Sequence, residues 1–195
     1  AATYHLQDLE MNYATGRHMA QPVFSGAFDV EDVVGMVRNT YAGRVKFHDG
    51  DAQVAPAVSV HLIGGHTMGL QVVRVATRRG WLVLASDASH FYANMEQVRP
   101  FPIVYNVADM VEGYARLRAL ADSPGHIIPG HDPLVLERYP APSGALQGIV
   151  ARLPKWLNGS LPQLHIPVVL HIGFDLEERG RRQDDPQTPG ESMCR

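Results

Sequence analysis

The sequence has little cysteine, no long apolar run and no cluster of basic residues. Its one cysteine, Cys194, excludes both a disulfide framework and a cysteine-rich metal site, so any metal must be held by histidine and carboxylate. No stretch approaches the roughly 20 apolar residues that span a bilayer, and the first residues do not resemble an export signal. With 17 basic and 20 acidic residues, the net charge of -3 gives no basic surface for nucleic acid. We therefore expect neither a nucleic-acid nor a membrane partner.

Cellular location is predicted from the same absences. The chain has no visible signal and a single cysteine, so the cytoplasm is the expected compartment. A signal upstream of Ala1 is left open, as is assembly into a homo-oligomer. The chain does not begin with methionine, and it starts inside what reads as a structural element.

Composition and patterning predict one globular domain followed by a tail. Hydrophobic residues make up 45% of the 195 residues and charged residues 19%, which suits a chain with a real core. We expect the domain to cover residues 1–153. Residues 154–195 are expected to form a divergent, disordered tail because they end in a polar run, although the apolar stretch at 164–174 reads as one more strand.

The hydrophobic periodicity predicts helices packed on a mostly antiparallel or mixed sheet. Strands are expected at 2–6, 58–63, 70–76, 81–86 and 126–128 because these stretches are apolar, alternating or β-branched. Helices are expected at 7–15, between a cap at Asp29 and Gly43, and from a cap at Asn106 to Ala121. The fold class is therefore α/β (α+β).

Three polar residues each follow the end of an apolar strand. They are His66, Asp87 and His131, and glycines at 64, 65 and 130 allow sharp turns beside the two histidines. Ends of neighbouring strands lie close in space, so the three side chains can converge. Imidazole and carboxylate without thiolate suit zinc, iron, manganese or cobalt, and a carboxylate can bridge two ions. The pattern indicates a metal site at one edge of the sheet.

Each of these residues also has an ordinary structural interpretation. His66 alone is typical of a turn, Asp87 alone of a helix cap, and Asp132 of a cap for the helix after it. The coincidence of three such residues favours the metal site without excluding these alternatives.

The motifs in which these residues stand resemble the metallo-β-lactamase superfamily, and most closely its N-acyl-homoserine lactonase branch. The matching motifs are Gly-Gly-His-Thr at 64–67 with Gly69, Ser-Asp-Ala at 86–88, and Pro-Gly-His-Asp-Pro at 129–133. The likeness covers roughly residues 3–153. It implies a four-layer αββα sandwich, here lacking its N-terminal strands, and a cofactor of two divalent metal ions, with zinc expected.

The resemblance also implies a role for each matching residue. His66 becomes a ligand of the first metal, Asp87 the carboxylate that bridges both metals, and His131 a ligand of the second. Thr67 and Asp132 become partners that orient these ligands. The implied activity is the metal-dependent opening of the lactone ring of N-acyl-homoserine lactones by hydroxide, which degrades a quorum signal.

Further residues are candidates for contact with the substrate. His90 stands three positions after the bridging aspartate, where some lactonases have a tyrosine that orients the lactone carbonyl; the alternative is an exposed helix residue. Bulky residues near the motifs are candidates for an apolar acyl-chain pocket, with burial in the core as the alternative for each: Met19, Phe24, Phe28, Met68, Phe91 and Tyr92.

The most diagnostic motif of the resembling family, His-x-His-x-Asp-His, does not occur in the 195 residues. In the family it supplies two ligands to each metal. We therefore expect the sequence to be the C-terminal part of such an enzyme. Two alternatives stay open: a hydrolase of thioesters or phosphodiesters on the same scaffold, and a truncated fragment without catalytic activity.

Overall fold

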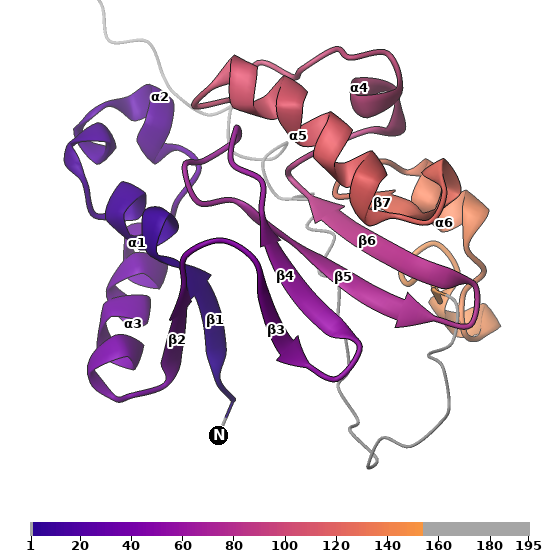
Figure 1. The fold of residues 1–195 in the computed structure, drawn as a ribbon, viewed down its shortest axis with the longest axis horizontal. Helices are drawn as coiled ribbons and strands as arrows, with labels where there is room; N and C mark the ends of the chain where they lie inside the picture. The colour runs from indigo at the N-terminus through magenta and orange to yellow at the C-terminus, as the bar shows by residue number, and fades with distance from the viewer. Residues whose placement is uncertain (1, 154–195) are drawn as a thin grey trace, which may run out of the picture.

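The structure, a computed structural model, describes residues 2–153, which form a mixed α/β arrangement (Figure 1). The strand predicted at 164–174 and the predicted disordered tail lie outside the described residues. Two sheets are present in the described part, one of five strands and one of two.

The larger sheet carries the predicted strand ends. Its strands have the order β3-β4-β5-β6-β7, and all neighbours are antiparallel except β6 and β7, which run parallel. The sheet is therefore mixed, as the sequence predicts. The strands are β3 (Ala52–Ala55), β4 (Val58–Leu62), β5 (Gln71–Thr77), β6 (Gly80–Ser86) and β7 (Ile127–Pro129).

The smaller sheet pairs β1 (Tyr4–Gln7) in parallel with β2 (Val45–His48), and helices α1 (Asp8–Ala14) and α3 (Val30–Tyr41) lie between them in the sequence. The Gln7 side chain links this sheet to the rest of the domain. Its amide donates to the Gly50 carbonyl at 2.8 Å and to the Gln71 side chain at 3.0 Å. Because Gln7 is buried, these bonds replace the water that its amide loses on folding.

The long helices begin at the predicted caps. The Asp29 side chain accepts from the Glu31 amide at the start of α3, and the Asn106 side chain accepts from the Ala108 amide at the start of α5 (Val107–Leu120). Helix α5 packs on β6 with one apolar stripe of fully buried residues, which are Met110, Tyr114 and Leu117.

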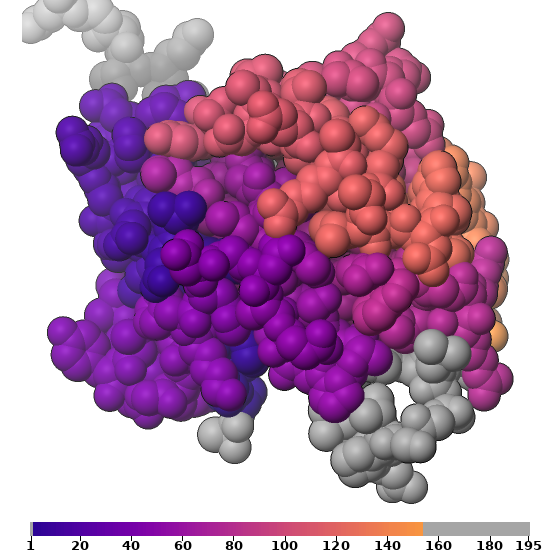
Figure 2. Space-filling view, in the orientation of Figure 1, coloured from indigo at the N-terminus to yellow at the C-terminus, as the bar shows by residue number. Residues whose placement is uncertain are grey.

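Short elements of three to five residues complete the described chain. The hydrophobic periodicity did not predict them because so few residues carry little periodicity, and only the helix after Asp132 was foreseen, from the alternative interpretation of that residue as a cap. The short elements are η1 (Arg17–Ala20), α2 (Pro22–Ser25), α4 (Tyr92–Glu96), η2 (Pro124–His126), α6 (Leu134–Arg138) and η3 (Gly144–Leu146), besides β2 and β3. The N-terminal elements lie beside one end of the larger sheet, and α5 lies across the β6–β7 end (Figure 2). Within residues 2–153 no helix combines the length and the apolar character needed to cross a membrane.

Candidate metal centre

The parallel pairing of β6 with β7 brings Asp87 and His131 together. In the register of these strands Ser86 lies opposite Pro129, so the chain leaves both strands at the same edge of the sheet. Ser86 has a positive φ of 46°, which turns the chain sharply just before Asp87. The Gly130 amide donates to the Ser89 carbonyl and the His131 amide to the His90 carbonyl, both at 3.0 Å. The two strand ends are therefore held together by their backbones.

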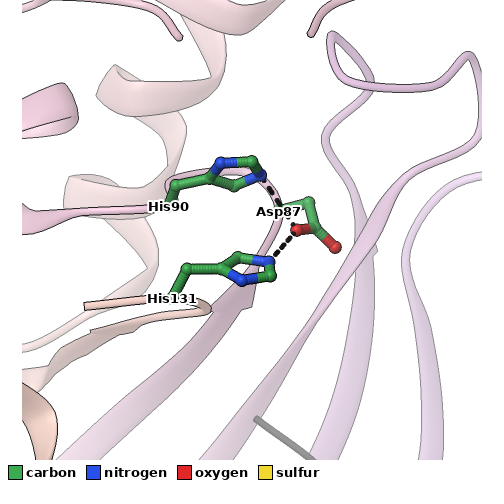
Figure 3. A group of neighbouring side chains, drawn as sticks. All are labelled: Asp87, His90 and His131. Atoms are coloured by element: carbon green, nitrogen blue, oxygen red, sulfur yellow. Dashed lines mark hydrogen bonds and ion pairs between the residues drawn. The ribbon is translucent and has the colours of Figure 1, made fainter. Parts of the chain in front are cut away.

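Asp87, His90 and His131 form a compact group of three possible ligands. The Nε2 atom of His131 lies 2.7 Å from Oδ1 of Asp87, and the Nε2 atom of His90 lies 3.1 Å from the same oxygen. One ligand atom from each residue lies within 4.8 Å of the others, and all three residues are partly buried. Figure 3 shows both imidazoles directed at the carboxylate. Two nitrogens and one oxygen at this spacing suit a divalent metal ion.

The charge of Asp87 is stabilised by its neighbours. Burial by itself would raise the pKa of this carboxyl group. The contacts with His90 and His131, together with the nearby His66, outweigh burial and hold the pKa of Asp87 well below its usual range. The carboxylate is therefore ionised, which is the form that binds a metal.

His66 lies beside this group but outside it. The preceding glycines have positive φ angles, 75° at Gly64 and 89° at Gly65, so the turn before His66 uses the conformational freedom that glycine provides. The Nδ1 atom of His66 donates to the Ile103 carbonyl at 2.7 Å. This bond leaves Nε2 as the nitrogen with a free lone pair. The ring centroid of His66 is 5.8 Å from that of His90.

The segment 101–106 supports both histidines. The Phe101 ring stacks on His90 with centroids 3.5 Å apart and planes 8° apart, and it also lies 5.6 Å from the His66 ring. The Tyr105 amide donates to the Gly65 carbonyl at 2.9 Å. This support was not predictable from residue types, because any residue can offer a backbone carbonyl such as that of Ile103.

The two predicted orienting residues take other partners. Asp132 accepts from the amides of Tyr92 at 2.8 Å and Leu134 at 2.9 Å, so it fixes the starts of α4 and α6. Thr67 is buried and faces Glu10. The predicted orienting oxygen on the His66 imidazole is thus supplied by Ile103. The effect of Thr67 and Asp132 on the ligands stays a prediction.

Glu10 is a residue that the sequence reasoning missed. Its carboxylate accepts from the Gly69 amide at 2.9 Å, and so holds the loop that carries His66. Burial raises the pKa of Glu10, while the Thr67 hydroxyl and the Gly69 amide oppose that shift. A side chain on Gly69 would clash with the Glu10 backbone, with Cβ only 2.1 Å from its nitrogen. No pattern in the sequence links Glu10 to Gly69, because the two residues are 59 positions apart.

The six predicted pocket residues do not form one wall. Phe24 and Phe28 pack around Tyr13, with centroids 6.5 and 5.8 Å from its ring. Phe28 also lines a cavity of about 280 Å³ between α1 and α3. Tyr92 is buried beneath Arg138, and Phe91 is exposed beside His90. Met19 lies in η1 and Met68 in the His66 loop. Their contact with an acyl chain stays a prediction.

Comparison with known proteins gives structural neighbours only. No family model matches the chain, and no curated protein matches it. A structure of an N-acyl homoserine lactone hydrolase with the product N-hexanoyl-L-homoserine at its catalytic metal centre has a TM-score of 0.53 and 23% identity over 66% of this chain and 46% of that one. A quorum-quenching N-acyl homoserine lactone lactonase has the same score and identity, over 67% and 50%.

A variant of the AiiA protein of B. thuringiensis with N-decanoyl-L-homoserine bound is similar to the same degree, with a TM-score of 0.53 and 23% identity over 66% of this chain and 46% of that one. The described residues therefore have the metallo-β-lactamase fold, as the sequence resemblance implies. The chain spans about half the length of these solved structures.

Proposed function

We propose that this chain carries part of the active site of a metal-dependent hydrolase that opens the lactone ring of N-acyl-homoserine lactones. The observation that carries the proposal is the approach of His131 to Asp87 at 2.7 Å, at the strand edge where the sequence motifs predict a metal site. Lactone hydrolases are among the structural neighbours, which supports this substrate class.

The residues present fit a metal ion. The Nε2 atom of His90 is buried and makes no hydrogen bond of good geometry with the described part of the chain, although it faces the Asp87 carboxylate. A buried nitrogen without a partner is unfavourable unless something binds it. His131 and Asp87 supply a second nitrogen and an oxygen, and we assign them to one metal, with zinc as the expected ion. His66, whose Nε2 is left free by the bond to Ile103, would hold a second ion together with Asp87.

The reaction follows from these assignments. Divalent ions at this site would supply Lewis acidity, which lowers the pKa of a water and polarises a carbonyl. When that water attacks the lactone carbonyl carbon, the bond from this carbon to the ring oxygen breaks. The Asp87 carboxylate is placed to carry the proton released by the water to the departing ring oxygen. The product is the open N-acyl-homoserine, and atoms and charge balance without any organic cofactor.

Hydrolysis of a thioester or a phosphodiester uses the same ligands, so a substrate panel decides between the classes. The 195-residue protein is loaded with zinc and assayed with N-hexanoyl-homoserine lactone, an acyl thioester and an aryl phosphodiester. We expect the lactone to be hydrolysed, and His131→Ala to abolish turnover. His48→Ala, in the smaller sheet, is the control and should retain it.

Each other outcome has a definite meaning. Preference for the thioester or the phosphodiester would replace the lactone by that substrate class. Absence of turnover on all three, with zinc bound, would contradict a hydrolase activity of this chain and leave the non-catalytic interpretation.

A further inference from the structure

His90 is distinguished from the other histidines near the site by its surroundings. The Phe101 ring stacks on the His90 ring in parallel, with centroids 3.5 Å apart. The His131 ring also lies close to it, with centroids 4.4 Å apart and planes tilted by 56°. Few orientations remain open to an imidazole that is packed in this way, so its Nε2 atom is held toward Asp87.

That nitrogen points at a carboxylate oxygen that a second imidazole also contacts. Among residues 2–153 the Nε2 atom of His90 is buried and has no hydrogen-bond partner of good geometry, yet it lies 3.1 Å from Oδ1 of Asp87. The Nε2 atom of His131 contacts the same oxygen at 2.7 Å. Two imidazole nitrogens and a carboxylate oxygen, all within 4.8 Å of one another, form a set of donors of the kind that binds a divalent ion.

His66 does not meet this description. Its ligand nitrogen falls outside the group in which atoms lie within 4.8 Å of one another, whereas that of His90 falls within it. Its Nδ1 atom has a partner in the Ile103 carbonyl. The sequence motifs pointed to His66, Asp87 and His131, but the geometry selects a different third residue.

We propose that His90 is a metal ligand and that Asp87, His90 and His131 together bind one divalent first-row ion. Two histidines and one carboxylate leave a position open for water or substrate, as in mononuclear catalytic zinc sites. Phe101 is then a positioning residue, because it holds the ligand ring without touching the ion. This inference rests on the proposed metal site, but not on the lactone as substrate.

Metal titration of the 195-residue protein tests this assignment. Cobalt(II) or zinc is titrated calorimetrically into metal-free wild type, His90→Phe and His66→Phe. Phenylalanine keeps a flat ring to stack on Phe101 and removes only the nitrogens. We expect one ion per wild-type chain at this site. We expect His90→Phe to weaken binding of this first ion at least about 100-fold, the upper end of the loss found for outer partners of metal ligands. His66→Phe removes a ligand of the other ion, so it should change the affinity for the first ion much less.

A second measurement separates ligation from folding. Imidazole nitrogen shifts are recorded by NMR for the wild type without zinc and with one equivalent of zinc. The first equivalent should move the Nε2 signals of His90 and His131 but not that of His66, which is assigned to the other ion. Circular dichroism of each metal-free variant checks that it is folded. Unchanged affinity in His90→Phe, an unmoved His90 signal, or loss of binding in His66→Phe would each overturn the proposal.

The outcomes distinguish this inference from the proposed function. Metal binding that depends on His90, with no turnover of lactone, leaves the ligand assignment standing and removes the substrate. If the wild type turns over lactone but His90→Phe binds the metal with full affinity, the proposed function stands and the assignment of His90 as a ligand is removed. A wild-type chain that binds neither ion refutes the ligand assignment outright.

Discussion

The Nε2 atom of His131 lies 2.7 Å from Oδ1 of Asp87, although the two residues are 44 positions apart in the sequence. The parallel register of β6 and β7 explains this contact, because Ser86 and Pro129 lie opposite each other and both chains turn at the same edge. Gly130 allows the turn, since the strands approach too closely there for a side chain. A Cβ atom at Gly130 would lie 2.7 Å from the Ser86 carbonyl oxygen.

Gly130→Ala should therefore separate His131 from Asp87. The atom that the new methyl group meets belongs to the backbone, so β6 or β7 must shift. We expect the free energy of unfolding to fall by about 1–3 kcal/mol, as for other overpacked sites, and zinc affinity to fall with it. Chemical denaturation and metal titration measure the two effects. Gly35→Ala is the matched control: it has nothing within 4 Å and lies inside α3, so it should stabilise the protein slightly. Equal effects of both substitutions would contradict this explanation.

Glu10 should hold the His66 loop through its acceptor oxygen rather than its charge. Glu10→Ala removes the partner of the Gly69 amide at a buried position, and we expect a loss of about 1–3 kcal/mol, as for an unpaired buried donor. Glu10→Gln keeps an acceptor oxygen and removes the charge of a carboxyl group. Burial disfavours that charge, as the raised pKa of Glu10 shows. The glutamine variant should therefore be as stable as the wild type at neutral pH, or more so. If thermal unfolding shows both variants equally destabilised, the charge is needed and the account of Glu10 is wrong.

A polar chain whose inner members, Ser59 and His61, are buried joins β4 to α5 and should contribute to stability as a unit. The Ser59 hydroxyl contacts Nε2 of His61 at 2.8 Å, and Nδ1 of His61 lies 2.8 Å from the Asp51 carboxylate, which also pairs with Arg116 of α5. His61→Leu leaves the Ser59 hydroxyl buried without a partner, so we expect a loss of about 1–3 kcal/mol. A double-mutant cycle checks this: Ser59→Ala should be less harmful in the His61→Leu background. Strict additivity would show that the two residues do not interact.

Alkaline stability should depend on Tyr92. Burial, assisted by Tyr139, raises the pKa of Tyr92 to about 12. A raised pKa means that the folded state holds the proton more tightly than the unfolded chain. The stabilisation is thus complete below pH 10, the ordinary pKa of tyrosine, and is lost as the pH rises through about 12.

Unfolding measurements at rising pH on Tyr92→Phe test this expectation. The variant cannot ionise at this position, so its stability should fall less steeply above pH 10 than that of the wild type. Tyr41→Phe, at a surface tyrosine that is 91% exposed, should follow the wild-type curve. Identical curves for all three proteins would rule out Tyr92 as a source of alkaline sensitivity.

The sequence predicted the parts of the fold whose periodicity extends over enough residues. The strands β4, β5 and β6 and the helices α3 and α5 were visible as alternating or helical patterns, and their capping residues were correct at Asp29 and Asn106. The convergence of Asp87 with His131 also followed from the rule that strand ends meet at a sheet edge. These features depend on local pattern or on general topology, which a single sequence contains.

Features that depend on packing between distant segments were not predictable in this way. The place of His90 in the ligand group depends on the Phe101 ring, and the orientation of His66 on the Ile103 carbonyl. Neither partner is marked by a motif. The four-residue strands β2 and β3 were missed because so few residues show no clear alternation.

The central claim is that Asp87 anchors a metal site at this edge of the sheet. The most direct measurement is the zinc content of the purified 195-residue protein, by elemental analysis after dialysis against buffer with trace zinc, for the wild type and Asp87→Ala. We expect bound zinc in the wild type, at least one ion per chain, and loss of that zinc in the variant. A wild type without zinc, or a variant that retains as much zinc as the wild type, would contradict it.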